Sequence, residues 1–110
     1  MKIKTLELTG AALDWAVAKC EGMSAEMLSE FDEGDWLYAG SRRYSTDWSQ
    51  GGPIIERENI ELERREDWTA KMCFQPVTRH EDGPTPLIAA MRCFCASKLG
   101  EEVEVPDELS

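Results

Sequence analysis

Apolar residues at helical spacing predict two principal helices, at about residues 10–20 and 86–99. Gly22 follows the first helix at a position where helices usually end, and Thr9 precedes it as a predicted N-cap. The second helix has Thr85 as N-cap and then Pro86 at its first position. The apolar stripes are Leu13, Ala16, Val17 and Cys20 in the first helix, and Leu87, Ile88, Met91, Phe94, Cys95 and Leu99 in the second.

Alternating apolar and polar residues predict strands elsewhere in the chain. Residues 59–63 and 68–74 alternate on either side of a short charged turn, which predicts an antiparallel hairpin. Residues 101–106 also alternate and predict an edge strand, while residues 1–8 fit either a short strand or an extended lead-in.

The remaining segments carry weaker signals. We expect a short helix at residues 25–31 and a strand at residues 36–39. The Gly-Gly-Pro sequence at residues 51–53 predicts a turn, with a helical turn starting at Pro53 as one option. Residues 75–83 are polar and predict a loop.

These elements together predict an α+β fold for residues 1–110 as one domain. A small antiparallel sheet would pack on the two principal helices, and residues 105–110 would form a frayed tail.

Charge narrows the range of functions. The chain has 22 acidic and 12 basic residues and a net charge of −10, which argues against direct binding of a nucleic-acid backbone. Such a negative field serves solubility or attracts a basic partner. No apolar run approaches the roughly 18 residues of a membrane span. The first residues also lack the apolar region of a secretion signal, so we expect a cytoplasmic protein.

The metal-ligating residue types are sparse. None of the four cysteines has C-x-x-C spacing, and His80 is the single histidine. We therefore predict no metal site and no cofactor, and we interpret the cysteines as reduced, mostly buried thiols.

The segment from Ser45 to Ile55 is the least generic part of the chain, because it sets a tryptophan among small polar residues. An aromatic wall with a few fixed polar groups is typical of a pocket for a planar, nucleotide-like ligand. The predicted ligand-binding residues are Asp14, Trp15, Tyr44, Thr46, Asp47, Trp48, Gln50, Gly51, Gly52, Thr85 and Arg92.

Two other functions compete with this pocket. An interaction module would bind another protein through acidic residues between Glu56 and Glu66 and in the tail, although Arg57, Arg64 and Arg65 interrupt that charge. An enzyme could pair carboxylates among Asp14, Asp47 and Glu56, but no nucleophile or metal cluster accompanies them. We therefore predict a non-catalytic protein with no catalytic residues. Its oligomeric state stays open.

Three blocks of the sequence, residues 7–18, 45–56 and 83–92, resemble the NinX-like family of lambdoid phage proteins. The resemblance implies a small accessory protein of a tailed phage or prophage of enteric bacteria. It implies no catalytic residue for this chain.

Two structural expectations separate a pocket from scaffolding. A pocket requires Trp15 and Trp48 to be half exposed around a common cleft, whereas a structural role requires both to be buried. We also expect the three blocks to meet in space.

Overall fold

The computed structural model describes residues 1–22, 43–74, 77–105 and 107. The helix expected at residues 25–31 and the strand expected at residues 36–39 lie outside these described residues. Three α-helices are present in the described part: α1 (Gly10–Cys20), α4 (Trp48–Arg57) and α5 (Pro86–Leu99), with the short 3-10 helix η1 at Thr5–Glu7.

Two antiparallel sheets accompany the helices. The larger sheet has the order β2–β3–β4, formed by Glu61–Arg64, Trp68–Phe74 and Val77–Gly83. The smaller one pairs β1 (Lys2–Lys4) with β5 (Glu102–Glu104). The predicted α+β class is confirmed, as is the hairpin between β2 and β3.

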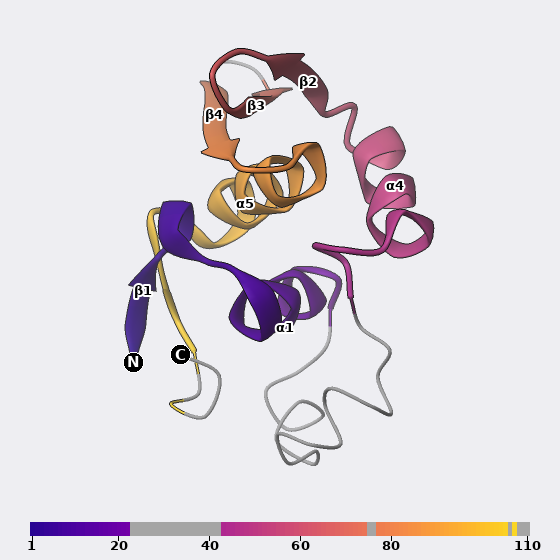
Figure 1. The fold of residues 1–110 in the computed structure, drawn as a ribbon. Coiled ribbons are helices and arrows are strands. Elements are labelled where there is room, and N and C mark those ends of the chain that lie inside the picture. Colours follow the sequence, from indigo (N-terminus) through magenta and orange to yellow (C-terminus); the bar gives the residue numbers. More distant parts are fainter. Residues whose placement is uncertain (23–42, 75–76, 106, 108–110) are drawn as a thin grey trace.

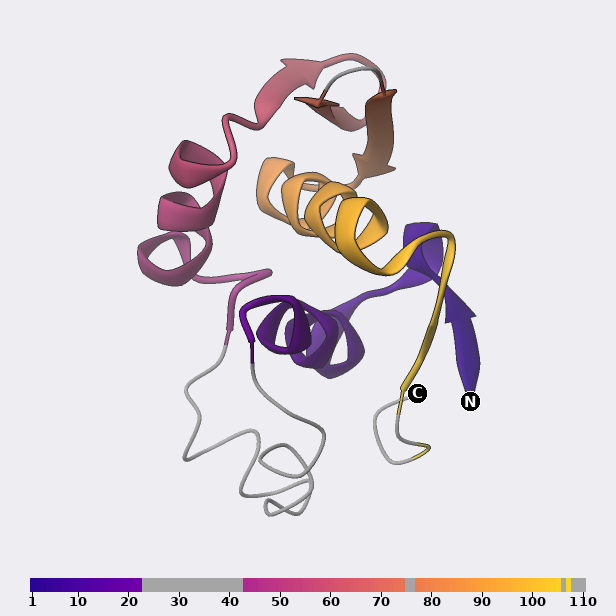
Figure 2. The same cartoon turned by 180° about the vertical axis from the view of Figure 1, so that it is seen from behind.

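Helix α5 forms the centre of the molecule (Figure 1). All three strands of the larger sheet contact it, and so do α1, α4, η1 and β5. Figure 2 shows the same arrangement from behind, with the sheet at one side of α5, α1 at the opposite side, and α4 and η1 flanking it. Between residues 89 and 96 of α5, every side chain except that of Arg92 is almost completely buried: Ala89, Ala90, Met91, Cys93, Phe94, Cys95 and Ala96.

The predicted loop at residues 75–83 is wrong for most of its length, because Val77–Gly83 forms β4. This strand pairs with β3 in a register that sets His80 opposite Lys71 and Gly83 opposite Trp68. It is an edge strand made largely of polar and charged residues, so it lacks the apolar alternation by which strands are recognised. Backbone pairing with β3 and packing on α5 hold it in place.

The predicted turn at residues 51–53 is also wrong, because these residues lie inside α4. The helix starts earlier, at Trp48, where the Asp47 side chain accepts a hydrogen bond from Ser49 N at 2.9 Å. Pro53 has no N–H to donate to the preceding turn, and glycine is a poor helix former. Tertiary packing overrides these local preferences, since Gly51 is buried against α5.

The two ends of the chain lie together. The Met1 amino group donates to Val105 O at 2.9 Å, and Val105 N donates back to Met1 O at 2.9 Å. The expected frayed tail therefore does not include Val105, which is buried because its apolar side chain packs in the core beside Val103.

Three cysteines are free thiols: Cys20, Cys93 and Cys95. The Cys20 thiol at the end of α1 contacts Cys95 on α5, and this contact, together with burial, raises the pKa of Cys95. Burial is the main cause that raises the pKa of Cys93 to about 12. These two thiols therefore stay protonated and act as small apolar side chains.

We expect Gly51→Ala to destabilise the protein. A Cβ on Gly51 would lie 2.4 Å from Tyr44 O and 2.5 Å from Leu87 Cδ1. Overpacking of this kind costs roughly 1–3 kcal/mol in the free energy of unfolding, which urea denaturation measures.

Gly52→Ala is the matched control in the next helical position. Its Cβ would meet no atom closer than Trp48 Cε3, at 3.9 Å. Alanine should therefore stabilise α4 by roughly 0.5–1 kcal/mol, through its higher helix propensity. Equal effects of the two substitutions would contradict the packing role of Gly51.

Candidate functional site

The three sequence blocks meet at α1, α5 and the segment that leads into α4. Ser45 N donates to Asp14 Oδ1 on α1 at 2.8 Å. Gly51 on α4 lies against Leu87 in the first turns of α5. Arg92 Nε on α5 donates to Leu8 O at 2.7 Å, just before α1. Contacts between blocks are thus spread over α1, α4 and α5 instead of converging on one point.

Asp14 is a buried carboxylate that anchors the segment before α4. Asp14 is 7% exposed, and the amide of Ser45, a residue that is 2% exposed, donates to its carboxylate. Burial raises the pKa of Asp14, and the hydrogen bonds from Ser45 oppose this shift. Asp14 thus connects two segments of the fold, 31 residues apart in sequence.

The polar residues at the start of α4 form a capping network. Asp47 Oδ1 accepts from Ser49 N at 2.9 Å and from Ser49 Oγ at 2.6 Å, while Gln50 Nε2 donates to Asp47 Oδ2 at 3.3 Å. Gln50 Oε1 in turn accepts from Arg43 N at 2.9 Å. The hydrogen bonds from Ser49 are the main cause that lowers the pKa of Asp47. Asp47 and Gln50 therefore shape the start of the helix, which accounts for polar residues at these positions.

The two tryptophans of the predicted pocket lie in different environments. Trp48 is 53% exposed on the first turn of α4, whereas Trp15 is 7% exposed on α1. The Lys19 ammonium lies 5.3 Å from the centre of the Trp15 ring, so this indole is engaged on its outer side too. Neither expectation is met in full, because a pocket required both tryptophans to be half exposed around a common cleft and a structural role required both to be buried.

The other predicted residues around Trp48 also differ in how deeply they are buried. Tyr44 packs against the core, and Gly51 is buried. Thr46 is exposed, and Gly52 is half-buried beside the Trp48 ring.

Thr85 and Arg92 do not join Trp48. Thr85 caps α5, accepting from Ile88 N at 3.1 Å, as the sequence predicts. Arg92 is on the side of α5 that faces η1 and β4, where Nη1 donates to Asp82 O at 2.9 Å. Figures 1 and 2 show α4 on the opposite side of α5. The sequence placed Thr85 and Arg92 at the last helix but did not show which side of that helix Arg92 would occupy.

A cleft of about 340 Å³ lies between η1, the turn before β3, the end of β4 and the middle of α5, where Arg92 lies. Leu6, Glu81 and Pro84 line it, and none of them belongs to the predicted site. They come from separate segments with no common motif, so the sequence offered no signal for this cleft.

Basic residues near α4 and β2 are engaged with their neighbours. Arg57 pairs with Glu21 and Glu58, and these hydrogen bonds raise its pKa. Further along the chain, Arg65 pairs with Glu63 at 3.2 Å. The Arg64 guanidinium lies 5.6 Å from the Trp68 ring centre.

The described residues hold no group of three or more His, Cys, Asp or Glu side chains placed to bind a metal ion. In this part of the chain, no helix has the length and apolar character that crossing a membrane requires.

We expect Asp14→Ala to cost about 1–3 kcal/mol in the free energy of unfolding, because it leaves the buried Ser45 N–H without an acceptor. Asp14→Asn keeps an acceptor oxygen and should cost less. The difference between the two variants, measured by urea denaturation, isolates the hydrogen bond.

The pH dependence provides a second test of Asp14. Its pKa is raised above 3.8 in the folded protein, so its contribution to stability is greatest below that pH and is lost as pH rises through the raised pKa. The stability of Asp14→Asn relative to the wild type should therefore increase from about pH 4 upward and then level off. A constant difference across this range would contradict the buried-carboxylate assignment.

Comparison with known proteins identifies the family. No curated protein sequence matches the chain. The family described as "Bacteriophage P22, NinX" matches residues 4–98, which include all three blocks noted in the sequence. Because this match spans most of the 110 residues, the resemblance is confirmed: the chain belongs to the NinX family and is a phage accessory protein.

Proposed function

We propose that this phage accessory protein is a non-catalytic binding protein of the host cytoplasm that stacks a planar, nucleotide-like ligand on the indole of Trp48. The observation that carries the proposal is the 53% exposure of this side chain on an ordered helix. An exposed indole gains little from water, but its face provides a stacking surface for any base.

The helix that carries Trp48 is fixed at several points, which favours binding because little order has to be created. The Asp47 cap holds its first turn, and Gly51 fits against Leu87. At its last turn, the Arg57 guanidinium lies 5.7 Å from the centre of the Phe94 ring on α5.

Groups suited to the rest of such a ligand precede Trp48 in the segment that leads into α4. Thr46 is exposed and offers a hydroxyl, and Arg43 is exposed and offers a positive charge to a phosphate. Arg43 also acts electrostatically on Asp47, which places its charge close to the start of α4.

The carboxylates considered for catalysis support a non-catalytic assignment. Asp14 is buried on the Ser45 amide, and Asp47 caps α4. Both are committed to hydrogen bonds that maintain the fold, so a general acid–base pair is not the role that their contacts favour.

A second candidate is an acidic module that binds a host or phage protein. The observation that favours it is the engagement of Arg57 and Arg65 with neighbouring carboxylates. These arginines interrupt the acidic run in the sequence, but each is held in an ion pair with a neighbouring carboxylate, so neither presents an uncompensated positive charge to a basic partner.

We expect at least one member of a panel of nucleotides and cyclic dinucleotides to raise the melting temperature of the wild type. Trp48→Ala should weaken binding of that ligand by about 1–3 kcal/mol, the usual contribution of base stacking on an aromatic side chain. Isothermal titration calorimetry would measure the change in affinity.

Leu6→Ala is the matched control, since Leu6 is 54% exposed but lies across α5 from Trp48, at the cleft near Arg92. It should leave the affinity unchanged. A flat response of the wild type across the whole panel, or equal losses in the two variants, would overturn the stacking proposal.

A further inference from the structure

The cleft at Arg92 has one apolar wall. It is formed by Leu6 on η1 and by Pro84 between β4 and α5. Leu6 is one of three large hydrophobic residues that are strongly exposed in the described structure. An apolar wall of this kind suits the methylene stem of a long side chain.

The other wall is acidic. Asp67, Glu81 and Asp82 all line the cleft. The Asp82 carboxylate accepts a hydrogen bond from Thr69 Oγ1 at 2.7 Å, whereas the Asp67 side chain is exposed. Asp67 and Glu81 are therefore the carboxylates best placed to meet an incoming group.

Arg92 offsets part of the Glu81 charge, while its Nε and Nη1 donors serve the backbone. Nε donates to Leu8 O at 2.7 Å and Nη1 to Asp82 O at 2.9 Å. These two bonds fasten the end of η1 and the end of β4 to α5. Arg92 is thus a positioning residue for the two walls.

Glu81 is half-buried in this acidic environment. Burial is the main cause that raises its pKa, and Asp82 and Glu101 add to the effect, while Arg79 and Arg92 oppose it. The charged form of Glu81 is therefore incompletely compensated by the protein itself. A cation in the cleft would supply the missing charge.

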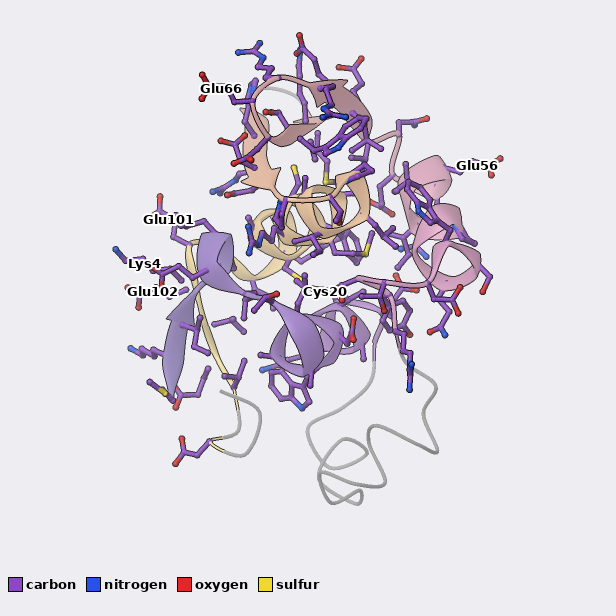
Figure 3. All side chains as sticks on the ribbon, viewed as in Figure 1. Lys4, Cys20, Glu56, Glu66, Glu101 and Glu102 are labelled. Carbon is purple, nitrogen blue, oxygen red and sulfur yellow. The ribbon has the colours of Figure 1, made fainter. Side chains whose placement is uncertain are left out.

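The surface around the cleft is mostly acidic. Figure 3 shows Glu66, Glu101 and Glu102 projecting, with Lys4 among them, on the side of the molecule where η1 and β4 lie, whereas Glu56 projects from α4 on the other side. A basic chain segment would therefore meet complementary charge on both sides of the cleft.

We propose that this cleft binds an arginine side chain presented by a basic segment of a protein partner. The guanidinium would pair with Glu81 and Asp67, and the stem would lie against Leu6 and Pro84. Arginine fits better than lysine because its planar fork pairs with carboxylates through two parallel hydrogen bonds. The site lies across α5 from Trp48, so it goes beyond the stacking proposal and gives the interaction module a defined location.

The test uses a fluorescently labelled hexa-arginine peptide and the full chain at physiological ionic strength, with affinity measured by anisotropy. The double variant Asp67→Asn/Glu81→Gln should weaken binding about tenfold, or about 1.4 kcal/mol, since it removes both pairing carboxylates. A hexa-lysine peptide should bind the wild type more weakly than hexa-arginine.

The control must remove the same charge elsewhere, because any polycation is attracted to a protein of net charge −10. Glu56→Gln/Glu61→Gln does so on α4 and on β2, which β3 separates from β4. Glu61 has only an exposed ion pair with Lys71 at 3.7 Å, so its loss should not harm the fold. This variant should bind within about twofold of the wild type.

Equal weakening in the two double variants would overturn the proposal and indicate non-specific attraction. A second measurement does not depend on any substitution: hexa-arginine should shift the backbone amide resonances of Leu6 and Gly83 in the wild type. If amides elsewhere shift instead, the cleft is not the site. Trp48→Ala should bind the peptide as the wild type does, so failure at Trp48 and failure at the cleft are distinguishable.

Discussion

Helix α5 is enclosed by other elements in nearly every direction, and this enclosure limits the rest of the structure. A helix with neighbours on all sides needs apolar atoms on every face and small residues where neighbours approach closely. Ala89, Ala90 and Ala96 meet that need, and the thiols of Cys93 and Cys95 stay protonated among them. Because the sheet, α1 and α4 all pack on α5, each of their positions is defined relative to this one helix.

The segment from residue 43 to residue 57 shows how one set of polar residues can suggest a ligand and yet build a helix start. Serine, aspartate and glutamine bind backbone amides as readily as they bind ligands. Most of the polar groups before α4 are used in this way by the Asp47 cap and the Asp14–Ser45 bond. The Trp48 indole is not part of this network and stays exposed on the first turn of α4.

The sequence predicted those elements whose signals are local. Thr85 and Pro86 mark the start of α5, and alternation marks the β2–β3 hairpin. Helix α4 and strand β4 escaped prediction because packing, not local preference, decides them: Gly51 must fit α5, and β4 is a polar strand at an edge. Most predicted site residues around Trp48 do lie together, since they are neighbours in sequence. Arg92 does not, because its side of α5 depends on the arrangement of η1 and β4.

The ribbon of β1 and β5 joins segments from the two ends of the chain. Its strands are about a chain length apart in sequence, since Lys2 pairs with Glu104, and neither strand is longer than three residues. Closing so long a loop for so few hydrogen bonds is unfavourable until the ends have been brought together. We therefore expect this ribbon to form late, after α1 and α5 have docked, and to open first under mild denaturant while the core around α5 persists.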